Sequence, residues 1–99
     1  MRDDIEEFRQ NELKEVLDTH SGDLSGFAPG GMGCHEALHM ASVYADDVYS
    51  RLAEHPAVIL NPDWFRLAME AGDRLFALYQ AIGAVHLADD AAIRQQEKS

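Results

Sequence analysis

The chain has 99 residues, 18 of them acidic and 8 basic, so its formal net charge is −10. This length allows one domain with a small core. An acidic surface repels nucleic-acid phosphates and anionic lipid headgroups, so we expect no direct nucleic-acid or membrane binding and favour a partner with a basic surface. A single cysteine cannot form an internal disulfide, and we expect neither a secretory signal nor a membrane-spanning segment. We therefore expect a cytoplasmic protein.

The first predicted element is a helix over residues 3–19. Ile5, Phe8 and Val16 recur there at helical spacing, but the apolar stripe is weak and needs a surface on which to dock. Residues 1–25 hold eight acids against three bases, which makes this segment an acidic arm. Residues 20–33 contain five of the seven glycines and are predicted to form a loop. Residues 1–33 are therefore assigned to the arm and a Gly-rich loop.

The second predicted helix covers residues 34–54. Apolar side chains from Cys34 to Leu52 fall on one face at helical spacing, with charged and polar residues opposite. Pro56 ends this helix because proline lacks the N–H that a helix interior requires.

The third predicted helix covers residues 62–88. Asn61 is a typical helix cap and Pro62 a typical first helical residue. Because a short connection makes neighbouring helices antiparallel, we expect an all-α fold whose core is a helical hairpin over residues 34–88. Residues 89–99 are expected to form a tail.

The helix over residues 62–88 is predicted to make an interface between copies of the chain. Its apolar side chains cover about half of the circumference, whereas an ordinary surface helix shows roughly a third. One neighbouring helix cannot cover that arc, so we expect two hairpins to pair into a four-helix bundle, as a homodimer or a higher oligomer. The predicted interface carries two glycines that allow close approach, and consists of Phe65, Gly72, Phe76, Tyr79 and Gly83.

One short motif indicates metal chemistry. The segment His35-Glu36-Ala37-Leu38-His39 matches H-E-x-x-H and resembles the zinc-binding helix of zincin metallopeptidases. That resemblance implies that His35 and His39 are zinc ligands and that Glu36 is the general base, the one catalytic candidate in the chain. Glu70, on the next helix, is the candidate third ligand.

The same histidines allow two further interpretations. His35, His39 and Asp46 fall within one narrow sector of the helix, and two imidazoles with a carboxylate suit zinc or another divalent metal without hydrolysis. His20, His86 or a group from a partner chain would complete such a site. Alternatively, the histidines are structural, hydrogen-bond to neighbouring groups, and require no cofactor.

The start of the second helix offers two weaker features. The segment from Gly30 to Gly33 presents backbone N–H groups that suit an anion, or it simply turns the chain. Cys34 lies at a helix start that lowers a thiol pKa, but its phase with Leu38 and Ala41 favours a buried, unreactive role.

Three function classes fit these features. The favoured one is a non-enzymatic interaction or regulatory module that acts as a homo-oligomer and whose acidic arm steers a basic partner protein. The second is a metal-binding protein or small metalloenzyme built on His35 and His39. The third is an acidic inhibitor that occupies the basic nucleic-acid-binding surface of another protein.

Overall fold

The computed structural model describes the backbone of residues 2–98 and the side chains of residues 4–88. Every regular element in this part of the chain is a helix, which confirms the all-α prediction. The elements are α1 (Arg2–Thr19), η1 (Ser25–Phe27), α2 (Met32–Asp47), η2 (Val48–Ala53), α3 (Pro56–Ile59) and α4 (Pro62–Lys98). None of the helices described is both long and apolar enough to cross a membrane.

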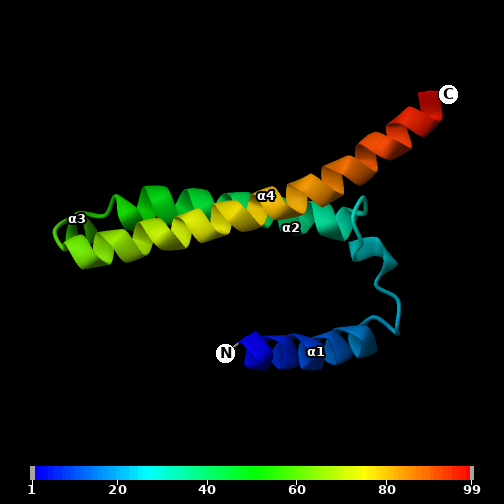
Figure 1. Ribbon diagram of the computed structural model, residues 1–99, viewed down its shortest axis with the longest axis horizontal. Coiled ribbons are helices and arrows are strands. Elements are labelled where there is room, and N and C mark those ends of the chain that lie inside the picture. Colours follow the sequence, from blue (N-terminus) through cyan, green and yellow to red (C-terminus); the bar gives the residue numbers. More distant parts are fainter. Residues whose placement is uncertain (1, 99) are drawn as a thin grey trace.

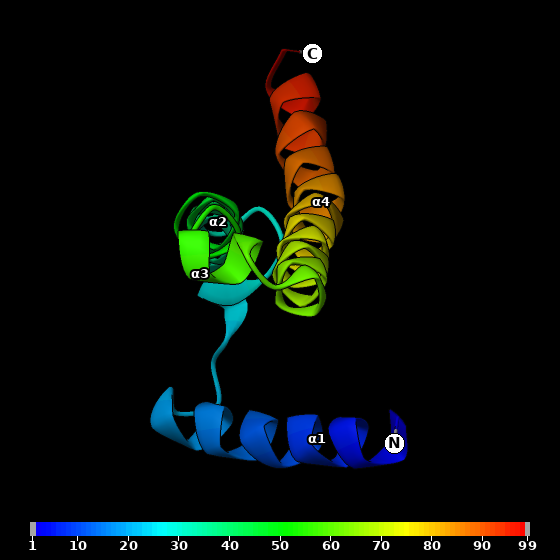
Figure 2. The same cartoon turned by 90° about the vertical axis from the view of Figure 1, so that its left-hand side faces the viewer.

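The core is a hairpin in which α2 and η2 pack along α4 (Figures 1 and 2). Small side chains fill most of the contact, so the two helix backbones lie close together. The buried apolar residues are Leu38, Ala41, Ala45, Ala53 and Ala68. No large side chain among residues 4–88 is completely buried, so the core is thin.

The second predicted helix contains an unexpected π-helical segment. η2 continues α2 with wider turns, and the Ser50 hydroxyl donates a hydrogen bond of 2.7 Å to the Asp46 carbonyl just before it. Side-chain bonds of this kind compete with the helical ladder and bend helices. The wider turns move later side chains around the axis, so Ala53 is buried while Leu52, expected on the core face, is half exposed.

The connection between the long helices contains the short helix α3, where the sequence predicted only a loop. Its first turn is capped by His55, whose Nδ1 accepts the Ala57 N–H at 3.1 Å. Asn61 then caps α4, as predicted, because its Oδ1 accepts the backbone N–H groups of Asp63 at 3.1 Å and Trp64 at 3.2 Å.

Helix α4 is longer than predicted and extends past the hairpin. Its backbone stays helical as far as Lys98, through most of the segment expected to be a tail. In Figure 1 this C-terminal part projects beyond the start of α2.

Helix α1 stands apart from the hairpin. Within the described residues it contacts no other helical element, and both views show it separated from α2 and α4 (Figures 1 and 2). The segment that joins it to α2 is nevertheless ordered. The His20 ring packs edge-on against Phe27 at 5.1 Å, and the Phe27 ring lies where a side chain on Gly33 would be.

Candidate functional site

The H-E-x-x-H segment lines an open pocket on α2. His35 and His39 lie one turn apart, and together with Glu36 and Met40 they border a cavity of about 430 Å³. The structure therefore places His35, Glu36 and His39, the three polar residues of the motif, around one pocket. The lining supplies a base and two imidazoles, but its fourth member is an unreactive thioether.

His86 of α4 lies next to this pocket and has a structural partner. It is only 5% exposed, and its ring centre is 5.6 Å from that of His35. Its Nδ1 accepts the backbone N–H of Gly30 at 2.9 Å, so in the neutral ring the proton is on Nε2. Metal binding through Nε2 would require that proton to leave. This contact joins residues 56 positions apart, and no local sequence pattern marks it.

The predicted metal ligands do not meet at one point. His35 and Asp46 are separated by about 16 Å along the helix axis, because each residue adds about 1.5 Å. Two groups bound to one zinc ion each lie about 2 Å from it. Among residues 4–88 no three His, Cys, Asp or Glu side chains gather closely enough to hold an ion, so neither Glu70 nor His20 completes a site with the His35–His39 pair. A site that takes ligands from a second copy stays a prediction.

The start of α2 leaves little room for an anion or a reactive thiol. Gly30 has a φ of 88°, which favours glycine, and its N–H is already bonded to His86. The Gly31 N–H bonds to the Ala28 carbonyl at 2.9 Å. Cys34 is half-buried, which is less than its phase with Leu38 and Ala41 predicted.

Some residues of the predicted interface pack inside the hairpin, and others are exposed to solvent. A Cβ on Gly72 would lie 2.4 Å from the Tyr49 ring, and a Cβ on Gly83 would lie 3.5 Å from a Leu38 methyl. Packing within one chain therefore explains Gly72, whereas Gly83 has room for a small side chain. Phe76 is 46% exposed and stacks on Tyr79, with ring centres 6.0 Å apart. The interface itself stays a prediction.

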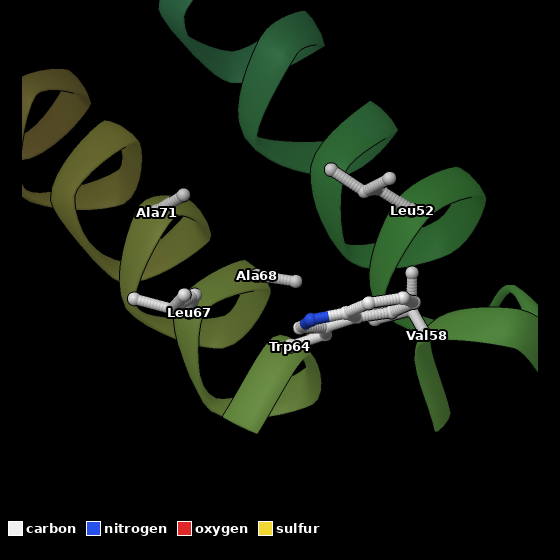
Figure 3. A pocket seen from close by; sticks show the side chains of 6 residues that line it. All are labelled: Leu52, Val58, Trp64, Leu67, Ala68 and Ala71. Carbon is white, nitrogen blue, oxygen red and sulfur yellow. The ribbon is translucent and has the colours of Figure 1, made fainter. Parts of the chain in front are cut away.

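Large apolar side chains remain exposed along both flanks of α4. Phe76 and Leu87 lie on one flank, and Trp64, Leu67, Leu78 and Val85 lie on the other. The second flank deepens near α3 into a groove of about 290 Å³. The groove is lined by Leu52, Val58, Trp64, Leu67, Ala68 and Ala71. Figure 3 shows Trp64 reaching from α4 toward Val58, with Leu52 on the facing helix.

Helix α1 has two distinct faces. Asp4, Glu7, Glu15 and Asp18 share one face at helical spacing, and all four are exposed. Lys14 borders this stripe. Ile5, Leu13, Val16 and Leu17 lie away from this stripe, whereas Phe8 borders it, one turn from Asp4 and from Asn11. The stripe is not apparent in the linear sequence, because acidic and basic residues alternate there. The acids line up only when the residues are placed around a helix.

One ion pair lies on the side of α1 away from the acidic stripe, next to Leu13. Glu6 accepts hydrogen bonds from Arg9 and Gln10, which lower the pKa of Glu6 to about 2. Arg9 is therefore occupied by Glu6 rather than by the acids of the stripe.

The functional candidates are thus a histidine pocket without a third ligand, an uncovered apolar surface on α4, and a detached acidic helix. Known protein families, curated proteins and solved structures show no match to this chain.

Proposed function

We propose that the protein is a small non-enzymatic interaction module that associates with itself through α4 and recruits a basic partner through α1. Its hairpins pair into a four-helix bundle across the flank that carries Phe76. The acidic stripe of α1 stays accessible in that assembly.

The exposed surface area carries this proposal. The chain exposes 8019 Å², whereas a compact protein of 11.0 kDa exposes about 5,600 Å². Its radius of gyration is 17.5 Å, against about 13 Å for a compact domain of this length. The excess of about 2,400 Å² per chain exceeds the ~800 Å² that each partner buries in a standard interface. Association with a second copy would cover this surface.

The exposed aromatic ring on the flank indicates where the copies meet. Phe76 is 46% exposed, so covering it would bury roughly half of a ring in each copy. Two such halves contribute about 1.5–3 kcal/mol, which corresponds to roughly 10- to 100-fold in the dissociation constant.

Light scattering across a concentration series tests self-association. We expect a mass of twice 11.0 kDa for the wild type and a dissociation constant about tenfold weaker or more for Phe76→Ser. Ala77→Ser is the matched control, because Ala77 is the exposed next residue on α4 and turns away from the flank. A wild-type mass that remains monomeric at every concentration would contradict the proposal.

The acidic stripe supports a basic partner. Attraction between a stripe of carboxylates and a basic surface accelerates association and weakens as salt rises. Proteins captured from the native host by the full chain should therefore be lost when Glu15 and Asp18 are both replaced by glutamine, and also at raised salt. Replacement of Asn11, which lies between the acids, by glutamine is the neutral control. The same stripe fits an acidic inhibitor, in which case the captured partner is a nucleic-acid-binding protein released by nucleic acid.

A metal role is the second candidate, because His35, Glu36 and His39 share one pocket. Zinc would have to bind between two copies, since one chain offers no third ligand among its described side chains. Titration with zinc should then raise both the melting temperature and the mass in the wild type, but not in His39→Ala. Binding should weaken below about pH 6 because the imidazoles must be neutral.

A further inference from the structure

The second uncovered surface of the hairpin, the groove beside Trp64, is distinct from the Phe76 flank. All six residues that line it are apolar, and it lies where η2, α3 and α4 meet (Figure 3). A ligand pocket of about 300–1,000 Å³ normally contains a few polar groups that orient the ligand. The one polar side-chain group in the lining of this groove of about 290 Å³ is the Trp64 indole N–H, so the groove suits one or two apolar side chains of a helix rather than a small polar molecule.

Helix α1 is the unpartnered element of the fold. Ile5 is 70% and Phe8 66% exposed, and the two lie one turn apart along one edge of the helix. A single helix of this length is marginal in water, and α1 lacks the alanine content that would support it alone. These exposed apolar side chains therefore require a surface on which to pack.

From these observations we propose that the edge of α1 that carries Ile5 and Phe8 packs into the Trp64 groove of a second copy, and that two copies exchange this helix reciprocally. The inference deepens the proposed self-association, on which it rests, by naming what covers the second flank. Ile5 and Phe8, one turn apart, are the side chains that enter the groove.

The ordered linker between α1 and α2 favours docking of α1 on a second copy rather than on its own chain. The Gly30 N–H is bonded to His86, and Phe27 packs on Gly33, so the linker is fastened to the hairpin at its α2 end. His20 packs on Phe27 and fixes how α1 leaves that point. Docking of α1 on its own hairpin would disrupt this arrangement, whereas docking on a second copy preserves it.

The areas are consistent with two interfaces. A bundle interface of standard size covers about 800 Å² of each chain, which leaves roughly 1,600 Å² of the excess exposed. Reciprocal exchange covers Ile5, Phe8 and the groove in both copies. The acidic stripe runs beside Phe8, and its far edge, at Glu7 and Asp18, remains exposed to a basic partner.

Trp64 reports on the groove, because it is the chain's one tryptophan and is 56% exposed. In the full-length wild type we expect acrylamide quenching to fall several-fold, and emission to shift to shorter wavelength, as concentration rises. Phe8→Ser should keep Trp64 as accessible as in dilute wild type. Gln10→Ser, on the opposite face of α1 from Phe8, should behave like the wild type. Raised salt should have little effect, because the contact is apolar.

Mixing two full-length variants tests the exchange directly. A Trp64→Phe chain provides an intact α1 without a fluorophore, and a Phe8→Ser chain provides Trp64 with a disabled α1. Shielding of Trp64 that returns only in the mixture would support the exchange. Shielding in the wild type that depends on Phe8 but not on concentration would place α1 on its own chain and overturn it.

Molar mass measured on the same samples separates the two proposals. A wild-type dimer whose Trp64 stays fully accessible overturns the exchange and leaves the Phe76 interface standing. Concentration-dependent shielding of Trp64 that survives in Phe76→Ser supports the exchange even where the bundle interface fails. A monomer at every concentration overturns both.

Discussion

Replacement of Gly72 by alanine is expected to destabilise the hairpin, whereas the same replacement at Gly83 is expected to stabilise it. Both glycines lie in α4, so alanine improves helix propensity equally, by about 1 kcal/mol. The two sites differ in the space that a Cβ meets. It would lie 2.4 Å from the Tyr49 ring at position 72, but 3.5 Å from a Leu38 methyl at position 83, which is ordinary contact.

The cost at position 72 follows from how the Tyr49 ring is held. The ring cannot move away freely, because its hydroxyl donates a hydrogen bond of 2.6 Å to Asp73. Overpacking costs about 1–3 kcal/mol, and loss of the hydrogen bond adds about 0.5–1.5 kcal/mol. After the gain in propensity, we expect Gly72→Ala to lower the free energy of unfolding by about 1–2 kcal/mol. Gly83→Ala should raise it by about 0.5–1 kcal/mol.

Urea denaturation at one fixed protein concentration provides the measurement, because self-association makes apparent stability depend on concentration. Combining Tyr49→Ala with Gly72→Ala removes the ring that the new Cβ would meet. In that background the alanine should be stabilising, which isolates the contact from any general effect on α4. Equal stabilisation at the two glycines in the wild-type background would refute the Gly72–Tyr49 packing.

Three further perturbations test single contacts. Asn61→Ala should cost about 1 kcal/mol in denaturation experiments, because it removes the cap of α4, while Asn61→Asp should retain most of it. The hydrogen bond to Asp73, with partial burial, raises the pKa of Tyr49, so its contribution to stability is complete below about pH 10 and is lost as pH rises through the raised value. One of the three tyrosines should therefore ionise late in a phenolate absorbance titration, and Asp73→Ala should abolish the delay. His86→Phe should speed hydrogen exchange at the Gly30 amide, whereas unchanged exchange would show that the linker is held by other contacts.

The local parts of the fold were predictable from the sequence. Asn61 followed by Pro62 predicts a helix start, because the capping hydrogen bonds involve only residues of the first turn. The long apolar stripes predicted both helices of the hairpin. The π-helical segment was not predictable, because nothing in the sequence from Val48 to Ala53 distinguishes wide turns from ordinary ones. This is why Leu52 was expected on the core face.

The candidate sites were less predictable, because they depend on distant contacts. Tyr49 approaches Gly72 closely, but spacing alone could not show that the approaching side chain comes from the same chain, or that Gly83 leaves room for a Cβ. The partnership of His86 with Gly30 is a contact across 56 positions, so His86 was considered only as a metal ligand. Spacing predicted that His35 and His39 share a face, and the helical rise of about 1.5 Å per residue already places Asp46 too far along the axis to bind the same ion.

The thin core of the hairpin and its uncovered flanks have one physical cause. Burying a methyl or methylene group contributes about 0.8 kcal/mol, while ordering one residue's backbone costs about 1–2 kcal/mol. Small residues such as Ala41 and Ala68 let the helices approach closely, but the free energy gained by burying them is smaller than the cost of ordering their backbone. The side chains large enough to offset this cost, such as Trp64 and Phe76, are half exposed and contribute fully only when a partner covers them. The melting temperature should consequently rise with protein concentration, and a melting temperature constant over a hundredfold dilution would mean that the hairpin is stable without its partner.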